Sequence, residues 1–258
     1  MIEFKNVSKA YYVKRNKSKA QIVLDDVSLK IEKNEFVCLL GPSGCGKTTI
    51  LNLIAGFERP TLGEVLLDDV PITKPSPDKG VVFQEYSLFP WMSAINNVVL
   101  ALECVGIPEK EGKIRAMEAL KEVNMDRSAD MRPNILSGGM KQRVAIARIL
   151  ALDPPLMLMD EPFSALDEHT REELDNDIKR IWRDKKKTVV FVTHIIDEAI
   201  TLATRIIMLS DAPGKIVKEW RIGPDVKRDL TSPEMIELKK DLLSTLLSCS
   251  TCQCWKKE

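Results

Sequence analysis

One eight-residue stretch near the N-terminus constrains the fold of this chain more than any other. Residues 41–48 have the sequence Gly-Pro-Ser-Gly-Cys-Gly-Lys-Thr, which fits the pattern G-x-x-x-x-G-K-[ST] of a phosphate-binding loop. An apolar run at 36–40 precedes this loop, and a second apolar stretch at 49–55, closed by Gly56, follows it. The order predicts a buried strand, a loop and a helix, which is the setting that this motif requires. We therefore expect the chain to bind a nucleoside triphosphate.

The residue types in the loop suit this chemistry. Glycines let the backbone curl so that several N–H groups point at one anion, and the following helix start adds partial positive charge. Lys47 can reach the β- and γ-phosphates, and the hydroxyl of Thr48 can bind Mg²⁺. The candidate nucleotide-binding residues here are Gly41, Pro42, Ser43, Gly44, Cys45, Gly46, Lys47, Thr48 and Thr49.

Cys45 allows two interpretations. A thiol near a helix start could have a lowered pKa and react with alkylating reagents. The simpler interpretation, which we prefer, is a small residue that fits inside the loop.

Charge and hydropathy exclude some classes of partner. The chain has 38 Lys and Arg residues and 38 Asp and Glu residues, so its formal net charge is zero. Binding to a nucleic-acid backbone needs a surplus of basic residues, and we therefore expect no nucleic-acid partner. We find no apolar run of about 18 residues, and residues 1–5 lack the pattern of a signal peptide. We expect a soluble, cytoplasmic chain that reaches any membrane through a partner.

The remaining pattern is that of an α/β fold with a helical insert. Strand-like alternation dominates residues 1–35, with a lysine-rich turn at 14–19, and helical spacing replaces it between residues 86 and 152. Wholly apolar runs, typical of the central strands of a parallel sheet, then recur at 156–159, 189–192 and 206–209, with a crossover helix expected at 169–183. The predicted domain covers residues 1–228, of which 1–85 and 153–228 form the α/β core and 86–152 the insert; residues 229–258 form a C-terminal helix, to about residue 247, and a Cys-containing tail.

Two acidic residues end the apolar run at 156–159. An aspartate at the tip of a strand beside a phosphate-binding loop can hold Mg²⁺, and Asp160 occupies this position. Glu161, the acid next to it, can orient or deprotonate the attacking water. General-base catalysis of this sort typically accelerates a reaction about 10²–10⁴-fold.

Together these motifs resemble the ATP-binding subunits of ABC transporters over residues 1–225. Residues 136–140 (Leu-Ser-Gly-Gly-Met) are similar to the family signature, L-S-G-G-Q, and residues 164–167 (Ser-Ala-Leu-Asp) are similar to its D-loop. Gln84 follows a predicted strand as the glutamine of the family does, and His194 stands where the family has its switch histidine. Tyr11 lies where the family stacks an aromatic ring on adenine, with Tyr12 as the alternative. The resemblance implies a P-loop NTPase core, in which a mostly parallel sheet is joined by an N-terminal antiparallel β part and an α-helical subdomain.

The resemblance also implies a mechanism that uses ATP and Mg²⁺. Thr48, Gln84 and Asp160 would hold the metal, and Ser137, Gly138 and Gly139 would bind the ATP of another copy, so that two chains form a head-to-tail dimer around two ATP molecules. Met140 replaces the glutamine of the signature, and we expect function to survive because the serine and glycines make the phosphate contacts in the family. The catalytic candidates are Glu161, His194, Gln84, Lys47 and Asp167.

A partner in the membrane is the next implication. The stretch at 85–92 is dense in large apolar residues, and Phe89, Trp91 and Met92 are either anchors of a docking groove for a membrane subunit or local core beneath the insert. Four segments, at residues 88–91, 136–143, 159–167 and 211–216, are similar to those of the nitrate, sulfonate and taurine importer ATPases. This implies two permease subunits, indirectly a periplasmic or extracellular solute-binding protein, and a peripheral place on the cytoplasmic face of the membrane.

Other functions remain open from the sequence. A soluble ABC ATPase of DNA maintenance or translation is disfavoured by the single cassette and the short interval between Lys47 and Ser137, and an exporter ATPase by the unfused cassette. The tail carries Cys249, Cys252 and Cys254, which allow metal binding, oxidation sensing or no role.

Overall fold

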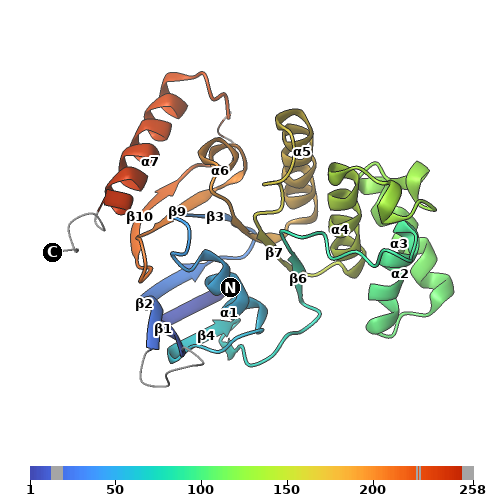
Figure 1. The fold of residues 1–258 in the computed structure, drawn as a ribbon, viewed down its shortest axis with the longest axis horizontal. Helices are drawn as coiled ribbons and strands as arrows, with labels where there is room; N and C mark the ends of the chain where they lie inside the picture. Colours follow the sequence, from blue (N-terminus) through green and yellow to red (C-terminus); the bar gives the residue numbers. More distant parts are fainter. Residues whose placement is uncertain (13–19, 225, 227, 252–258) are drawn as a thin grey trace. The chain divides into compact units, whose positions relative to one another are not determined.

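A computed structural model describes residues 1–12, 20–224, 226 and 228–251 of the chain (Figure 1). The lysine-rich turn predicted at 14–19, and Cys252 and Cys254 of the tail, lie outside the described residues. The chain forms two compact units, one made of Met1–Ser76 with Thr188–Glu258 and the other of Pro77–Lys187. We call them unit 1 and unit 2 and describe each by itself.

Unit 1 begins with an antiparallel sheet of four strands. In spatial order these are β2 (Ala20–Ile31), β1 (Ile2–Tyr12), β4 (Leu62–Leu67) and β5 (Val70–Pro71). The sheet appears in blue and cyan in Figure 1. Phe4 of β1 lies opposite Leu29 of β2 and Val65 of β4, and all three side chains are buried. The alternation of apolar residues read from the sequence therefore places one face of this sheet in the core.

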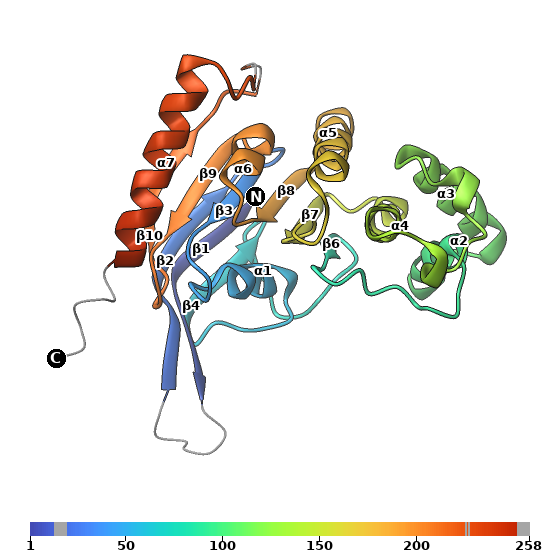
Figure 2. The same cartoon turned by 45° about the horizontal axis from the view of Figure 1, so that its top comes forward.

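A mainly parallel sheet forms the rest of the core of unit 1. Its strands in this unit are β10 (Ile216–Arg221), β9 (Arg205–Leu209), β3 (Phe36–Leu40) and β8 (Thr188–Val192), in this order. β3 is parallel to both β8 and β9, and every residue of β3 is buried, as expected for a central strand. Helices α1 (Lys47–Ala55), α6 (Ile196–Leu202) and α7 (Pro233–Thr251) complete the unit, and Figure 2 shows α7 beside β9 and β10.

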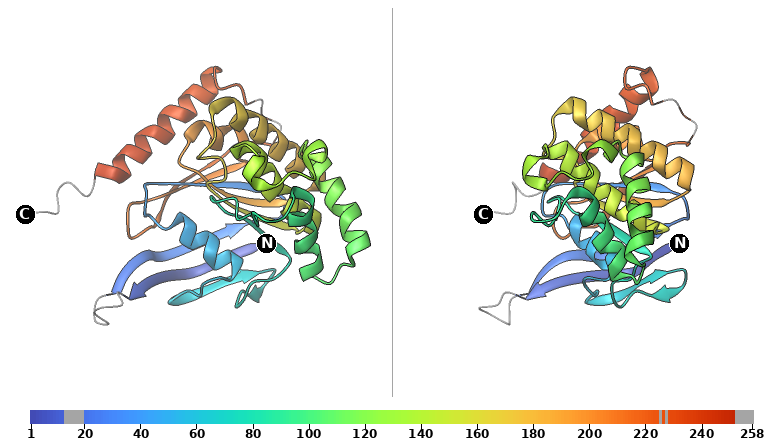
Figure 3. Two further views of the ribbon diagram at one scale, coloured as in Figure 1. Left: turned by 45° about the vertical axis from the view of Figure 1, so that its right-hand side comes forward. Right: turned by 90° about the vertical axis from the view of Figure 1, so that its right-hand side faces the viewer.

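Unit 2 combines two parallel strands with helices. β6 (Lys79–Val82) pairs with β7 (Leu156–Asp160), and the helices are α2 (Ala94–Cys104), α3 (Glu109–Glu122), α4 (Gly138–Leu152) and α5 (Glu168–Lys185). Short 3₁₀ turns occupy Asp126–Ser128 and Pro133–Ile135. Helices α2, α3 and α4 pack against one another, as Figure 3 shows in green. These helices form the insert that the sequence predicted within the α/β chain.

The fold class is confirmed, while some element boundaries differ. The residues that follow the signature predict a helix over 141–150, but α4 begins earlier, at Gly138, and ends at Leu152. Glycine is a poor helix former, yet Ser137 caps α4 through its side chain and the first turn forms on the glycines. β10 was not predicted, because its residues are mostly exposed at an edge and lack the apolar pattern. The domain boundaries at 85/86 and 152/153 stay predictions.

The helices in the described part of the chain include no candidate membrane span. None of these helices is both long enough and apolar enough to cross a bilayer.

Candidate functional site

The phosphate-binding loop follows β3 in unit 1 and leads directly into α1. Gly44 and Gly46 have φ angles of +79° and +100°, a conformation that L-residues with side chains rarely adopt. A methyl group on Gly46 would also lie 2.6 Å from Cδ2 of Leu24, whereas one on Gly44 would meet no described atom within 4 Å. Gly46 is therefore required by both conformation and packing, and Gly44 by conformation alone.

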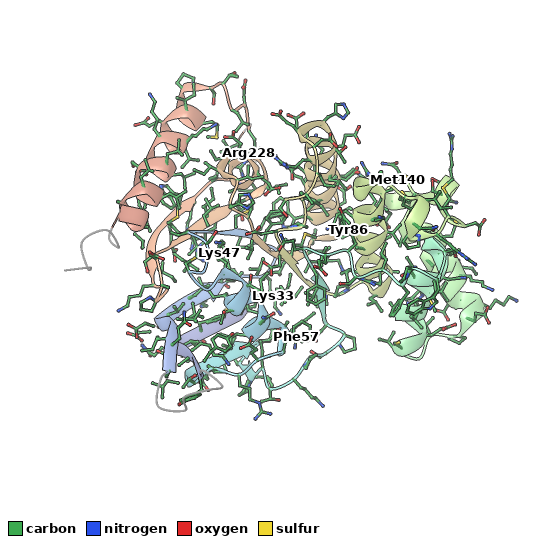
Figure 4. All side chains as sticks on the ribbon, viewed as in Figure 1. Lys33, Lys47, Phe57, Tyr86, Met140 and Arg228 are labelled. Carbon is green, nitrogen blue, oxygen red and sulfur yellow. The ribbon has the colours of Figure 1, made fainter. Side chains whose placement is uncertain are left out.

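Lys47 is held inside this loop. Its side chain is buried, and its ammonium group donates hydrogen bonds to the carbonyl oxygens of Gly41 and Pro42 at 2.8 and 2.9 Å. Figure 4 labels Lys47 at the start of α1. Gly46, the residue before α1, has no side chain to cap the helix. A buried ammonium group at the positive end of a helix is a donor set that fits a phosphate.

Cys45 is fully buried in the same loop. Burial raises the pKa of its thiol, although the charge of Lys47 acts in the opposite direction. The interpretation as a reactive thiol is therefore wrong, and the structure supports a small residue that packs inside the loop. Gly214 packs against the backbone of the loop, since a methyl group on Gly214 would lie 2.0 Å from the carbonyl oxygen of Cys45.

His194 lies at the same edge of the sheet as the loop. β3 and β8 are parallel, with Leu39 opposite Val192, so the residues that follow these two strands leave the sheet side by side. The N–H of Thr193 donates to the carbonyl oxygen of Leu39 at 3.4 Å, and His194, one residue later, is exposed. The arrangement suits contact between His194 and a phosphate held by the loop.

Tyr11, at the end of β1, is fixed by polar contacts. Its hydroxyl donates to Oε2 of Glu58 at 2.6 Å and lies 3.5 Å from Oγ1 of Thr49 in α1. Lys9 places its Nζ 4.9 Å from the centre of the ring. Burial, together with the hydrogen bond to Glu58, raises the pKa of the Tyr11 phenol. The ring is partly exposed and held in place, while Tyr12 is more exposed, and stacking on adenine stays a prediction.

Three candidate residues of unit 2 gather at the carboxyl ends of β6 and β7. These strands are parallel, with Val82 opposite Met159. Asp160 is the last residue of β7 and Gln84 lies two residues after Val82, so both stand at the same end of the strand pair. Nε2 of Gln84 donates to Oγ of Ser164 at 3.4 Å, and this hydroxyl donates to the carbonyl oxygen of Glu161 at 3.1 Å. Hydrogen bonds thus join the glutamine to the backbone of the candidate general base.

The backbone of Glu161 is unusual. Its φ angle is +44°, in the left-handed region that a residue with a long side chain rarely occupies. Such conformations cost about 1–3 kcal/mol and cluster at active sites. The outlier supports a functional assignment for Glu161.

The signature residues open α4. The side chain of Ser137 accepts the N–H of Met140 at 3.3 Å, and Gly138 and Gly139 form the first turn of the helix. Figure 4 labels Met140 in this turn. The positive end of a helix can attract an anion, and Met140 leaves the serine cap in place.

Asp167 caps the next helix of unit 2. Its carboxylate accepts the N–H and the hydroxyl of Thr170 at 3.0 and 2.8 Å, and these bonds lower the pKa of Asp167. The structure thus gives Asp167 a structural task at the start of α5, and its catalytic role stays a prediction.

The metal candidates belong to both units. Thr48 stands in the first turn of α1 in unit 1, whereas in unit 2 Gln84 follows β6 and Asp160 is the last residue of β7. Their hydroxyl, amide and carboxylate oxygens are the hard donors that Mg²⁺ prefers, so the residue types fit the ion.

Sequence reasoning missed Asn97 of α2. Its buried amide accepts the N–H of Phe89 at 2.7 Å and donates to the carbonyl oxygens of Phe89, Met92 and Ser93 at 3.2, 3.3 and 2.9 Å. An asparagine at an apolar position of a helical pattern was the available signal. Asn97 therefore shapes the aromatic loop, residues 86–93.

The aromatic loop presents Trp91 to solvent. This side chain is 65% exposed, and its ring lies 5.5 Å from the ring of Phe89, which is 37% exposed. Local core is therefore the wrong interpretation for Trp91, although it was an open alternative from the sequence.

The chain is similar in sequence to known ATP-binding proteins. The family model described as ABC transporter matches residues 24–164. An uncharacterized ABC transporter ATP-binding protein of Methanocaldococcus jannaschii is 46% identical, with 95% of this chain and 91% of that protein covered. The bicarbonate transport ATP-binding protein CmpD of Synechococcus elongatus is 42% identical (93% and 88% covered), and the taurine import ATP-binding protein TauB of Chromobacterium violaceum is 41% identical (93% and 95% covered).

A solved structure agrees in fold. The dimeric ATP-binding cassette MJ0796, in a post-hydrolysis state bound to ADP and Pi, superposes with a TM-score of 0.76. It is 38% identical, and the match covers 86% of this chain and 99% of that one.

The phosphate-binding loop on a parallel sheet, the strand ending in two acids and the capped signature helix define a P-loop ATPase with a helical insert. The chain belongs to the ABC transporter family of ATP-binding proteins and is an ABC ATPase.

Proposed function

We propose that this chain is the ATP-hydrolysing subunit of a membrane importer for a small solute such as nitrate, a sulfonate, taurine or bicarbonate. The relatives named for bicarbonate and taurine transport support this class of cargo. The observation that carries the proposal is the aromatic loop, because it begins two residues after Gln84, exposes Trp91 and is fixed by Asn97. A rigid loop with an exposed aromatic ring is typical of a docking surface.

Binding of ATP is assigned to unit 1. Lys47 and the N–H groups of the loop bind the phosphates, and the hydroxyl of Thr48 would hold Mg²⁺. Tyr11 stacks on the adenine ring with little base specificity, which predicts a loose preference among nucleotides. The buried ammonium group of Lys47 and its place at the start of α1 support this assignment.

Hydrolysis depends on residues that follow the parallel strands. Glu161 accepts a proton from the attacking water as general base, and His194 contacts the γ-phosphate and keeps that water in place. Gln84 and Asp160 would hold Mg²⁺, and the ion would neutralise charge on the phosphates. Asp167 supports the closed dimer. The left-handed backbone of Glu161 and the hydrogen-bond chain from Gln84 support these roles.

A second copy of the chain completes each site. Ser137, Gly138 and Gly139 bind the γ-phosphate held by Lys47 of the partner copy, so that two ATP molecules lie in a two-fold symmetric dimer. Dimer closure then depends on ATP, and hydrolysis reopens the dimer. The helix start that these three residues form supports this role.

The membrane partners are two permease subunits. Phe89, Trp91 and Met92 take a short helix of each permease, with Trp91 as the anchor, and hold the ATPase on the cytoplasmic face of the membrane. The solute-binding protein acts only through the permeases, and the ATPase does not touch the cargo.

Co-purification with permeases that are encoded beside this chain tests the proposal. We expect a complex of two ATPase chains and two permease subunits, and Trp91→Ala should reduce its yield about tenfold or more, as loss of an interface anchor does. Ile114→Ala is the matched control, since Ile114 is an exposed apolar residue of α3 in the same unit. Binding to DNA or ribosomes without permeases would contradict the importer role, and so would outward transport in liposomes.

A further inference from the structure

The first two glycines of α4 lie against side chains from two other segments of unit 2. A methyl group on Gly138 would lie 2.9 Å from the hydroxyl oxygen of Tyr86, and one on Gly139 would lie 2.5 Å from Cγ2 of Thr170. Favourable contacts between such atoms need about 3.5–4.0 Å. Both glycines have helical backbone, which any residue can adopt. Their small size is therefore required by neighbours within the chain.

Tyr86 cannot move away easily from Gly138. Arg148 of α4 donates from Nη1 to the carbonyl oxygen of Ser87 at 2.7 Å and from Nη2 to that of Tyr86 at 3.3 Å. Arg148 thus fastens the backbone of Tyr86 to α4, while the hydroxyl of Tyr86 reaches the start of the same helix. Figure 4 labels Tyr86 and Met140. The segment directly after Gln84 therefore touches the signature.

Thr170 is fixed against Gly139 in a similar way. Its N–H and its hydroxyl both donate to the carboxylate of Asp167, at 3.0 and 2.8 Å. These two bonds select one rotamer of the side chain, and this rotamer directs Cγ2 at Gly139. The start of α5 therefore touches the signature as well, next to Leu166, whose Cδ2 would lie 3.4 Å from a methyl group on Gly138.

We propose that Tyr86 and Thr170 are positioning residues of the ATPase, which set the place of the signature residues relative to Gln84 and Asp167. The inference rests on the proposed binding of phosphate by Ser137, Gly138 and Gly139. Close-packed contacts transmit displacement because they resist compression. A shift of Gln84 or Asp167 during turnover then displaces the start of α4 with it.

Paired substitutions test this inference in the purified chain. Gly138→Ala and Gly139→Ala should each lower kcat about tenfold with little change in KM, because the added methyl group displaces the start of α4. Tyr86→Phe removes only the hydroxyl and should restore most of the kcat lost in Gly138→Ala. Thr170→Ser removes only Cγ2, keeps the hydroxyl bond to Asp167, and should restore most of the kcat lost in Gly139→Ala.

The crossed pairs are the matched controls. Gly138→Ala with Thr170→Ser, and Gly139→Ala with Tyr86→Phe, should stay as slow as the single alanine variants. Tyr86→Phe and Thr170→Ser alone remove the groups that lie against the glycines, so each should lower kcat by a smaller factor than the alanine variants, and thermal unfolding of all variants checks that they fold. Recovery in the matched pairs alone supports the inference. It is overturned by normal kcat in the alanine variants, by no recovery in the matched pairs, or by equal recovery in the crossed pairs.

A further variant distinguishes a failure of this inference from a failure of the proposed phosphate binding by the signature, on which the inference rests. Ser137→Ala leaves both glycine contacts intact, so a wild-type rate of hydrolysis in this variant would contradict the phosphate-binding role of the signature. Failure of the importer role would leave all these rates unchanged, since the assay contains no permease.

Discussion

The phosphate-binding loop of unit 1 and the signature of unit 2 use glycine for different physical reasons. Both are glycine-rich stretches that open a helix and present a positive helix end. In the loop, Gly44 and Gly46 have positive φ angles, so the backbone itself demands glycine. In the signature, Gly138 and Gly139 have helical backbone and are small because Tyr86 and Thr170 lie against them. The loop thus needs glycine for its backbone conformation, and at Gly46 also for packing, whereas the signature needs glycine for packing alone.

The largest expected effect is the loss of ATP binding by the monomer, which should depend on the loop and not on the signature. Lys47→Ala should abolish detectable ATP binding by the monomer, because it removes the buried ammonium group from the loop. Ser137→Ala should leave binding by the monomer unchanged and reduce only hydrolysis and ATP-dependent dimerisation. Binding of a fluorescent ATP analogue and sedimentation with ATP measure the two properties. If Ser137→Ala also lost binding by the monomer, the assignment of one region to each copy would be wrong.

A smaller effect tests the chemistry that follows β7. Glu161→Gln should keep ATP binding, slow hydrolysis about a hundredfold or more through loss of the general base, and accumulate an ATP-bound dimer. Steady-state phosphate release and gel filtration with ATP measure both outcomes. Glu172→Gln is a suitable control, since Glu172 is an exposed glutamate of α5 in the same unit that the mechanism does not use. Near-normal turnover of Glu161→Gln would refute the assigned role.

The smallest effect concerns the conformation of the loop alone. Gly44→Ala should destabilise the chain by about 1 kcal/mol, because φ is positive there although a methyl group meets no described atom. Gly44→Asn should cost less, since asparagine tolerates the left-handed region better. Urea unfolding without nucleotide measures both. Equal losses would indicate that space, rather than φ, decides this position.

Much of this fold could be predicted because its signals are local. The loop at 41–48 predicted β3 and α1, and the apolar runs predicted β7, β8 and β9. The edge strand β10 escaped, since an exposed strand has no apolar run to reveal it.

Contacts between distant segments could not be predicted. The hydrogen bonds of Asn97 to the aromatic loop, the reach of Tyr86 to Gly138 and the left-handed backbone of Glu161 all depend on how segments meet after folding. The start of α4 at Gly138 escaped for a related reason, because a serine cap outweighed the low helix propensity of glycine.

Complementation between two defective copies tests the central claim most directly. Lys47→Ala lacks a working loop and Ser137→Arg lacks a working signature, so each variant alone should hydrolyse almost no ATP. In a mixed dimer, the intact loop of one copy meets the intact signature of the other. The account predicts that mixing equal amounts restores hydrolysis, to at most about half of the wild-type rate, because each mixed dimer has one of its two sites intact. A mixture as inactive as its two components would contradict the account.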